Sequence, residues 1–346
     1  MEISLFHVII INNIFLFKII EGFYFMIDGH IKEIIVVDSS AFLHRYYHGY
    51  SNLESIYNGK RINVGALNGY MNYIFKLKKE FPHDHLIHIL DPEGGSAFRK
   101  ELLPGYKSNR TDKEEAFTIQ KNLLTQVLDG FQQPWIQADG IESDDIISTY
   151  CSIYGKDHFV LIAGQDKDLT QCIVDEHPEG EGLVMMASLV KDSRGFNIHE
   201  RRNEQYVIDK FGVHPAQMAD FLALTGDGSD NILGIPGVGD KKAAELLNKY
   251  FDIENIIMNA NNIKGKLGEN IRAGLDTLPL MKQLTRTLTD LELPRIEDIP
   301  PVKDKELNIF VRELIHAENY WADDLTEYTQ PVPSLNRRPN YDRFIK

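Results

Sequence analysis

Two aspartates stand close together in the segment TGDGSDNILGIPGVGDKKAAELL, which spans residues 225–247. Asp227 and Asp230 are separated only by small residues, an arrangement that suits a hard cation. The turn that follows is rich in glycine and leads into two lysines: Gly234, Gly237, Gly239, Lys241 and Lys242. Backbone amides of such a turn can approach a phosphate, because no side chain blocks them. Carboxylates for a metal next to amides and lysines for phosphate predict a metal-dependent enzyme that binds a nucleic-acid backbone.

Short apolar runs elsewhere in the chain also lead into acids. The runs and their acids are residues 34–37 before Asp38, residues 86–90 before Asp91, and residues 160–162 before Asp166 and Asp168. Continuous β-branched runs separated by helical segments are typical of buried parallel strands. Functional groups in open α/β sheets lie beyond the carboxyl ends of the strands, so we expect these acids to share one site.

The intervening segments predict helices and one basic loop. Apolar spacing over residues 65–81 and over residues 203–224 indicates helices, and Glu142, Asp144 and Asp145 open another. In residues 96–110, Pro104 and Gly105 interrupt any helix, and basic side chains outnumber the single acid. Residues 261–269 are polar and contain glycine, which predicts a loop, and one further helix is expected over residues 306–317.

If the acids converge, they cannot all stay ionised without cations. Oxygen ligands without paired His or Cys favour Mg²⁺ or Mn²⁺ over zinc. Two such ions roughly 4 Å apart activate a water and stabilise the leaving oxygen in phosphodiester hydrolysis. The alternative is that these acids are helix caps and solvated turns of an acidic protein. That alternative is competitive for any single acid, and weak for acids at successive strand ends.

Other chemistries are less well supported. His83, His85 and His88 flank or lie within an apolar strand and are expected to be core or surface histidines. The glycines at 234–239 are not in the dinucleotide-binding order and no P-loop motif is present. Ser39 and Ser40 show no sign of an activated nucleophile.

Composition sets outer limits on these hypotheses. The chain has 346 residues, 43% of them hydrophobic, which is enough for one large domain or two ordinary ones. A net charge of −14 excludes coating nucleic acid by bulk attraction, but not an acidic metal site. Cys151 and Cys172 lack metal-ligand spacing and fit a reduced, cytoplasmic protein. Residues 1–25 are apolar but interrupted, so a non-essential extension is favoured over a membrane anchor or signal peptide.

Five motifs together resemble the 5′-nuclease (flap endonuclease) family, in the order found there. They are VVDSSAFLHRYYHG (36–49), ILDPEGGSAFRKELLPGYKSNR (89–110), GIESDDII (140–147), AGQDKDLTQ (163–171) and FLALTGDGSDNILGIPGVGDKKAAELL (221–247). The chain is most similar to the 5′→3′ exonuclease domain of bacterial DNA polymerase I and to stand-alone phage 5′-exonucleases. One departure is conservative: Ala163-Gly-Gln165 precedes the Asp166–Asp168 pair. Because no polymerase domain follows, we expect a stand-alone enzyme.

The resemblance implies a role for each motif. A first metal site would consist of Asp38, Asp91, Glu142, Asp144 and Asp145. A second, looser one would consist of Asp166, Asp168, Asp227 and Asp230. A helical arch would engage the scissile phosphate and the 5′ strand through Arg99, Tyr106, Lys107 and Arg110, with Lys107 and Arg99 in catalytic roles. The 234–239 turn would hold the duplex as a helix–three-turn–helix, with K⁺ bound there in several members of the family.

The expected fold is α/β: a PIN-like domain with a central, mostly parallel sheet over residues 27–205, including an arch near 94–130. A helix–three-turn–helix domain (206–294) follows, between an apolar extension (1–26) and a C-terminal extension (295–346). The predicted function is Mg²⁺-dependent 5′→3′ exonuclease or 5′-flap cleavage of DNA in replication or repair, with RNA–DNA hybrid as a further substrate. A monomer without a membrane partner is expected. The competing hypotheses are a non-catalytic DNA-structure binder and a Mg²⁺-dependent phosphatase.

Overall fold

The computed structural model describes residues 8–11, 14–19, 22–26, 32–49, 53–57, 60–110, 115–131 and 133–299. The helix expected over residues 306–317 lies outside them. No helix in these ranges is both long enough and apolar enough to cross a membrane.

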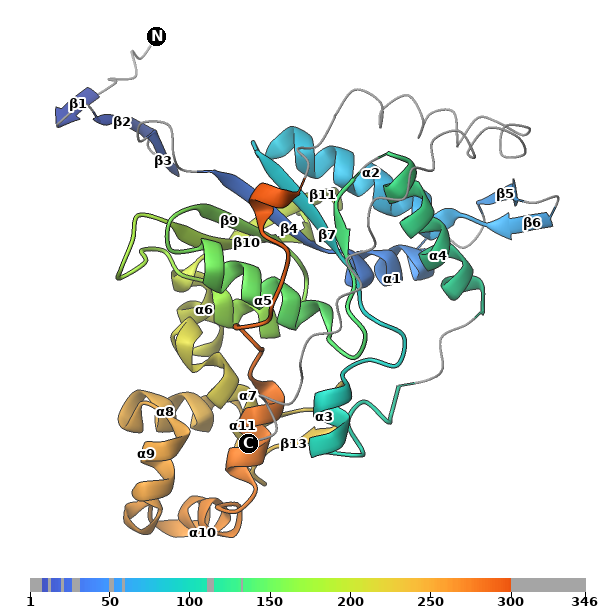
Figure 1. Cartoon of the computed structure of the whole chain (residues 1–346). Coiled ribbons are helices and arrows are strands. Elements are labelled where there is room, and N and C mark those ends of the chain that lie inside the picture. Colours follow the sequence, from blue (N-terminus) through green and yellow to red (C-terminus); the bar gives the residue numbers. More distant parts are fainter. Residues whose placement is uncertain are drawn as a thin grey trace.

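A six-stranded sheet forms the centre of the N-terminal part (Figure 1). Its order is β11 (Asn197–Arg202), β10 (Leu183–Lys191), β9 (Phe159–Ala163), β4 (Glu33–Asp38), β7 (His85–Ile89) and β8 (Trp135–Ile136). Neighbouring strands are parallel except for β10 and β11. The register pairs Asp38 with Ile89 and Val37 with Ala163. The strands that lead into Asp38, Asp91 and Asp166 therefore end side by side, as the sequence predicts.

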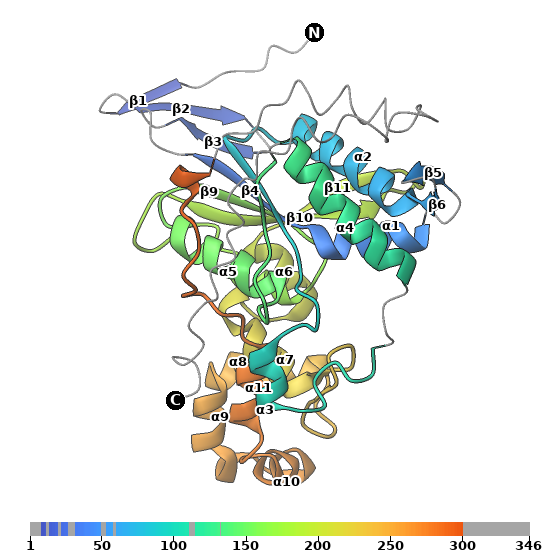
Figure 2. The same cartoon turned by 45° about the vertical axis from the view of Figure 1, so that its right-hand side comes forward.

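Helices cover both faces of this sheet (Figure 2). Ile34 and Val36 of β4 belong to the core that α5 (Ser143–Tyr154) closes, and the alternate residues Ile35 and Val37 face the opposite core. That second core lies under α1 (Ser39–Gly49), α2 (Gly65–Glu80) and α4 (Glu115–Gly130). A strand buried on both faces must be apolar throughout, which explains the continuous runs in the sequence.

The C-terminal part is helical and shares the core of the α5 side. It contains α6 (Glu204–Phe211), η2 (Pro215–Gln217), α7 (Met218–Thr225), α8 (Asp240–Tyr250), α9 (Ile253–Met258), η3 (Ala260–Asn262), α10 (Gly265–Ala273), α11 (Leu278–Thr285) and η4 (Ile296–Asp298). Two short strands, β12 (Gly226–Asp227) and β13 (Ile232–Leu233), form a hairpin after α7. The Thr285 hydroxyl of α11 donates to the Ala219 carbonyl of α7 at 2.8 Å. Helix α11 thus returns to α7, the helix that leads into Asp227.

One loop prediction is wrong. Residues 261–269 were expected to be a loop, but α10 begins within them, at Gly265. A Cβ on Gly268 would lie 1.7 Å from the carbonyl oxygen of Ile263. Gly268 therefore permits a close approach of two backbone segments, and its presence does not indicate a flexible loop.

Besides the β12–β13 hairpin, two small sheets lie outside the main one. Strands β1 (Val8–Ile11), β2 (Ile14–Ile19) and β3 (Gly22–Met26) form an antiparallel meander within the apolar N-terminal segment. Strands β5 (Glu54–Tyr57) and β6 (Lys60–Asn63) form a hairpin between α1 and α2. Neither sheet contributes a predicted site residue.

The predicted arch begins with a short helix, α3 (Ala97–Leu102). The Ser96 hydroxyl caps it by accepting the Arg99 amide at 3.1 Å. The helix ends before Pro104, as the sequence predicts, and turns follow to residue 109. Residues 111–114, at the centre of the predicted arch, lie outside the described ranges.

Candidate metal and nucleic-acid site

The acids at the ends of β4 and β7 are linked through helix starts. Asp38 accepts the Ala41 amide at 3.1 Å and so stabilises the first turn of α1. The Asp91 amide donates to the Ser40 hydroxyl at 2.8 Å. Asp91 in turn accepts both the amide and the hydroxyl of Ser143, each at 2.9 Å. These bonds hold the starts of α1 and α5 against the carboxyl edge of the sheet, and α5 brings Glu142, Asp144 and Asp145 there.

Three carboxylates at this edge lie near other carboxylates. Burial, followed by the charge of the nearby Asp91, raises the pKa of Asp38 to about 8. Burial, followed by the charge of Asp166, raises the pKa of Asp144 and of Asp168 well above the ordinary range. The Oδ1 atom of Asp168 is buried and has no hydrogen-bond partner in the described structure. Lys107 lowers the pKa of Asp144 and Lys167 lowers that of Asp168, but burial and the neighbouring acids outweigh both.

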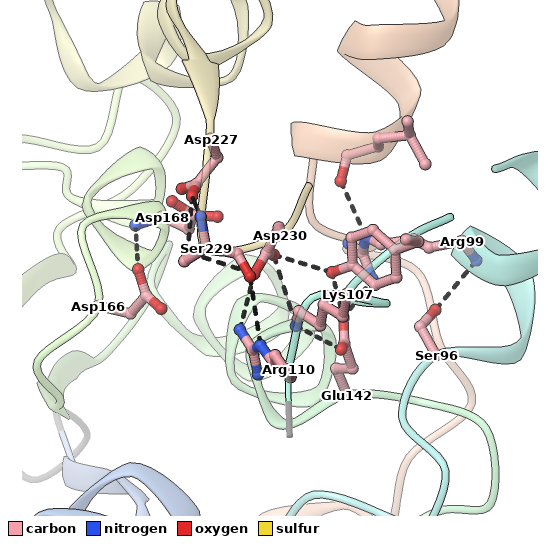
Figure 3. Close-up of polar contacts among 12 residues, drawn as sticks. Ser96, Arg99, Lys107, Arg110, Glu142, Asp166, Asp168, Asp227, Ser229 and Asp230 are labelled. Atoms are coloured by element: carbon pink, nitrogen blue, oxygen red, sulfur yellow. Dashed lines mark hydrogen bonds and ion pairs between the residues drawn. The ribbon is translucent and has the colours of Figure 1, made fainter. Parts of the chain in front are cut away.

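A second set of carboxylates is neutralised by the protein itself (Figure 3). The Lys107 ammonium lies 2.5 Å from Glu142 and 3.5 Å from Asp230. Arg110 lies 2.7 Å from the other oxygen of Asp230. The buried Tyr106 hydroxyl lies 2.9 Å from Glu142 and 3.0 Å from Asp230, and its single proton is shared between these two acceptors. Tyr106, expected to contact DNA, therefore bridges two acids inside the site.

Asp227 is also paired. Its Oδ2 lies 3.0 Å from the Lys167 ammonium, and its Oδ1 accepts the amide and hydroxyl of Ser229 at 2.8 and 2.6 Å. Burial alone would raise the pKa of Asp227, but the hydrogen bonds from Ser229 and Lys167 lower it. Lys167 stands between Asp166 and Asp168 in the sequence, so it links the second predicted metal set to the hairpin.

The basic loop and the hairpin loop bind each other directly. The Lys107 amide donates to the Asp230 carbonyl at 3.0 Å, and the Asn231 side chain donates to the Gly105 carbonyl at 2.7 Å. Lys107 and Asn231 adopt positive φ angles of 52° and 58°. Such backbone conformations are unfavourable for residues other than glycine and occur often at functional sites. Residues 105–110 and 228–231, far apart in sequence, form one unit.

Arg99 and Asp145 form a buried pair. Arg99 is 3% exposed, and its Nη1 and Nη2 lie 2.7 and 2.8 Å from the two oxygens of Asp145. Its remaining donors reach a carboxylate oxygen of Glu142 at 3.2 Å and the carbonyls of Leu284 and Arg286 at 2.9 and 3.0 Å. Asp145 also accepts the Leu288 amide at 2.9 Å. In this arrangement Arg99 has no donor left for a phosphate, and Asp145 is bound to protein groups where a metal ligand was expected.

No three described His, Cys, Asp or Glu side chains converge closely enough to hold a metal ion. The chemistry of the donor set nevertheless fits divalent cations, because it consists of carboxylate oxygens that raise one another's pKa. The unpartnered Oδ1 of Asp168 is a further oxygen available as a ligand. His88, by contrast, is a core histidine: it is fully buried and hydrogen-bonded to Tyr70.

The glycine-rich turn leads into α8. Position 234 requires glycine, because a Cβ there would lie 2.3 Å from the Thr225 carbonyl carbon. Position 237 favours glycine, because its φ is 75°. Gly239 caps α8 without a side-chain hydrogen bond, and a Cβ there would meet nothing within 4 Å. The first amides of α8 are thus accessible, next to the exposed Lys241 and Lys242.

Several positioning residues were missed by the sequence analysis. Arg45 donates to Gln165 at 2.6 Å and to the Leu189 carbonyl at 2.9 Å, and Lys121 donates to the Asp91 carbonyl at 2.5 Å. Lys167 was also overlooked, although its place between two acids could have identified it. No comparable signal marks Arg45 or Lys121, because their partners are distant in sequence.

Two family models cover most of the chain. Residues 33–212 match the 5′-3′ exonuclease N-terminal resolvase-like domain, and residues 213–306 match the 5′-3′ exonuclease C-terminal SAM fold. DNA polymerase I of Rhizobium leguminosarum is 35% identical over 75% of this chain and 25% of its own length. A 5′-3′ exonuclease of Buchnera aphidicola subsp. Acyrthosiphon pisum is 30% identical over 79% of this chain and 90% of its own.

A solved structure shares the fold: a T5 D15 flap endonuclease complex with DNA and metal ions. It aligns with a TM-score of 0.55 and 20% identity, over 82% of this chain and 98% of that one. The chain spans 25% to 31% of the length of the first DNA polymerase I relatives. With both family models matched in order, across the sheet and the helical part that together build the site, the chain belongs to the 5′-3′ exonuclease family.

Proposed function

We propose that the chain is a divalent-metal-dependent nuclease that hydrolyses DNA phosphodiester bonds from 5′ ends, at nicks or at 5′ flaps. One observation carries this proposal: acids that follow separate strands and an acid at the start of α5 raise one another's pKa at one edge of the sheet. Acids that served only as helix caps would not need to face each other. The family membership and the T5 complex with DNA and metal ions support the same function.

Some residues would hold the metal ions, and others would contact the DNA phosphate. Asp38, Asp91 and Asp144 would hold one Mg²⁺ or Mn²⁺, with Asp166, Asp168 and Asp227 at a second. When bound, the ions would supply an activated water and stabilise the leaving oxygen. Glu142 and Asp230 are neutralised by Lys107 and Arg110 in the present arrangement. These two basic side chains would turn to the scissile phosphate when the acids take cations.

The turn at residues 234–239 would hold the duplex at a set distance from the acids. Gly239 and the first amides of α8 are open to a phosphate, and Lys241 and Lys242 add charge. A K⁺ ion at this turn and a role in replication or repair are part of the same proposal. RNA–DNA hybrid is a further candidate substrate, because contacts to the backbone do not read base sequence.

We propose different roles for Arg99 and Asp145 from those the family resemblance implies. Their mutual pair fixes α3 and α5 to residues 284–288. Both would therefore be positioning residues that place Glu142 and the 105–110 loop, and neither would touch metal or phosphate.

The test is cleavage of labelled 5′-flap and nicked duplexes with Mg²⁺ and then with EDTA, for the wild type and Asp144→Asn. We expect cleavage by the wild type in Mg²⁺ only, and none above background by the variant. A DNA-structure binder would bind without cleaving, and a phosphatase would release phosphate from 5′-phosphorylated ends without shortening the strand. Metal-independent cleavage, or unchanged cleavage by Asp144→Asn, would contradict the proposal.

A further inference from the structure

The described structure contains a cavity between α5 and the helical part, behind the acids of α5. Its volume is about 430 Å³, and it lies along Ser148, Cys151, Cys172, Thr287 and Lys282, among others. The proposed nuclease chemistry uses none of these side chains. Two of them, Cys151 and Cys172, are the only cysteines of the chain.

The two thiols come from the two elements that hold the acids. Cys151 is near the end of α5, and Cys172 is the last residue of η1 (Asp168–Cys172). Both are free, with Cys151 buried and Cys172 partly exposed. The Cys172 sulfur lies 3.0 Å from the Ser148 hydroxyl, which stands three residues before Cys151 on the same face of the helix. The helix and η1 thus present both thiols to one cavity.

The thiols also interact with each other, and their roles differ. A hydrogen bond to Cys151 lowers the pKa of Cys172, and a further bond from Ser148 acts in the same direction. Burial raises the pKa of Cys151 well above its ordinary value. A partly exposed sulfur that more readily becomes a thiolate is the attacking thiol of a pair, and a buried neighbour resolves it.

We propose that Cys151 and Cys172 form a modification site, an accessible dithiol that a small disulfide such as oxidised glutathione converts to an intramolecular disulfide. The Cys172 thiolate attacks one sulfur of the oxidant, forms a mixed disulfide and releases one glutathione. Cys151 loses its proton to water, attacks the Cys172 sulfur and releases the second glutathione. The two protein thiols are oxidised, and one molecule of the oxidant is reduced to two thiols.

The disulfide would tie together the two acid-bearing elements. A disulfide restricts the Cα–Cα separation of its two cysteines to about 4.4–6.8 Å, so it would fix η1 relative to α5. Asp144 lies at the start of α5 and Asp168 at the start of η1. Displacements of about 1 Å can reduce catalysis strongly. Resting on the proposed nuclease function, we therefore expect oxidation to slow DNA cleavage and a reductant to restore it.

The experiment treats the reduced full chain with oxidised glutathione, alkylates the remaining thiols after denaturation, and measures the intact mass. We expect two alkylated cysteines before oxidation and none after, and the oxidised monomer should weigh about 2 Da less than the reduced, unalkylated chain because two hydrogens are lost. Cys151→Ser should stop at one glutathione on Cys172. Cys172→Ser should react several-fold more slowly. Two alkylated cysteines after treatment, or only disulfide-linked dimers, would overturn the proposal.

A matched pair of variants tests the role of the hydroxyl. Ser148→Ala removes the bond to Cys172 and should slow mixed-disulfide formation several-fold, whereas Ser152→Ala changes another serine of the same cavity and should not. Equal rates for these two variants would contradict the assignment of Cys172 as the attacking thiol.

Cleavage is then compared between oxidised wild type and oxidised Cys151→Ser, which cannot close the disulfide. The mass measurements do not depend on nuclease activity. The mass results would therefore stand even if the protein proved not to be a nuclease. Unchanged cleavage by an active enzyme whose disulfide has closed would refute only the expected effect of oxidation on cleavage.

Discussion

The site contains two sets of carboxylates that differ in how their charge is balanced. Asp38, Asp144 and Asp168 face other acids, and burial raises the pKa of each. Glu142, Asp145 and Asp230 each contact a basic side chain within 2.7 Å. A carboxylate whose counter-charge belongs to the protein contributes to holding the fold, whereas one without it depends on a cation from solution. Acids in neighbouring positions thus differ in whether the protein or a cation from solution balances their charge.

The contrast is sharpest within α5, where Asp144 and Asp145 are adjacent. Asp144 turns toward Asp166 and Asp38, and Asp145 turns toward Arg99 and the Leu288 amide. We therefore expect substitutions of the first set to change cleavage and metal response without lowering metal-free stability, and substitutions of the second set to lower metal-free stability. The predictions below test that division.

The largest effect is expected from Arg99→Met. Removing the arginine leaves Asp145 buried without its partner, which typically costs about 3–5 kcal/mol of the free energy of unfolding. Arg110→Met is the matched control: Arg110 is half exposed, and its loss should cost less than about 1 kcal/mol. Urea denaturation of the metal-free proteins measures both. Equal losses would show that the buried pair is not a structural link.

Asp38→Asn should reduce Mg²⁺-dependent cleavage at least about 100-fold, comparable to the loss of one electrostatic group in an active site. The same substitution should leave the metal-free protein as stable as the wild type or more stable, because asparagine stays neutral beside Asp91 at every pH. Single-turnover kinetics measure the cleavage rate, and urea denaturation measures the metal-free stability. A large loss of metal-free stability would place Asp38 in the structural set instead.

The metal-free protein should lose stability as the pH rises. Burial and the charge of Asp91 raise the pKa of Asp38 from 3.8 to about 8, so the folded state holds this proton more tightly than the unfolded state. Its stabilising contribution is therefore complete below about pH 4 and is lost as the pH rises through about 8. Each unit of pKa shift corresponds to about 1.4 kcal/mol. Thermal unfolding in EDTA between pH 5 and 9 measures the slope.

Mg²⁺ should oppose this loss, because a cation that binds only the folded state stabilises it by about 2.7 kcal/mol at 100 times its Kd. Asp38→Asn should reduce both the pH slope and the response to Mg²⁺. A pH profile that is flat in EDTA, or identical with and without Mg²⁺, would contradict the charge assignment of the first set.

The smallest effect is expected at the turn into α8. Replacing both Lys241 and Lys242 with Ala should weaken DNA binding and reduce the slope of log K against log salt by about 1–2. Single-turnover cleavage at saturating DNA should be unchanged. Lys249→Ala, at the far end of the same helix, is the control and should change neither quantity. A similar effect of Lys249→Ala would indicate bulk attraction by the helix instead of a defined contact.

Much of the fold could be predicted from local patterns. The apolar runs before Asp38 and Asp91, the helix over residues 65–80 and the helix after Glu142 all depend on periodicity or chain-breaking residues within a short window. The prediction of a loop at residues 261–269 was wrong because it also depended on a local pattern alone. Position 268 requires glycine because the carbonyl of Ile263 lies too close for a side chain. No local pattern distinguishes that use of glycine from a flexible turn.

The sequence by itself determined which acids reach the edge of the sheet, because strand direction and register place residues that follow neighbouring parallel strands together. Only the tertiary structure decided how each acid is used. Arg99 is 46 residues from Asp145, and its carbonyl partner Leu284 is 185 residues away. A pKa, a buried ion pair and the meeting of Cys151 with Cys172 all depend on distances of a few ångströms between such remote segments. A one-dimensional pattern does not contain those distances, whereas packing around a shared core sets them.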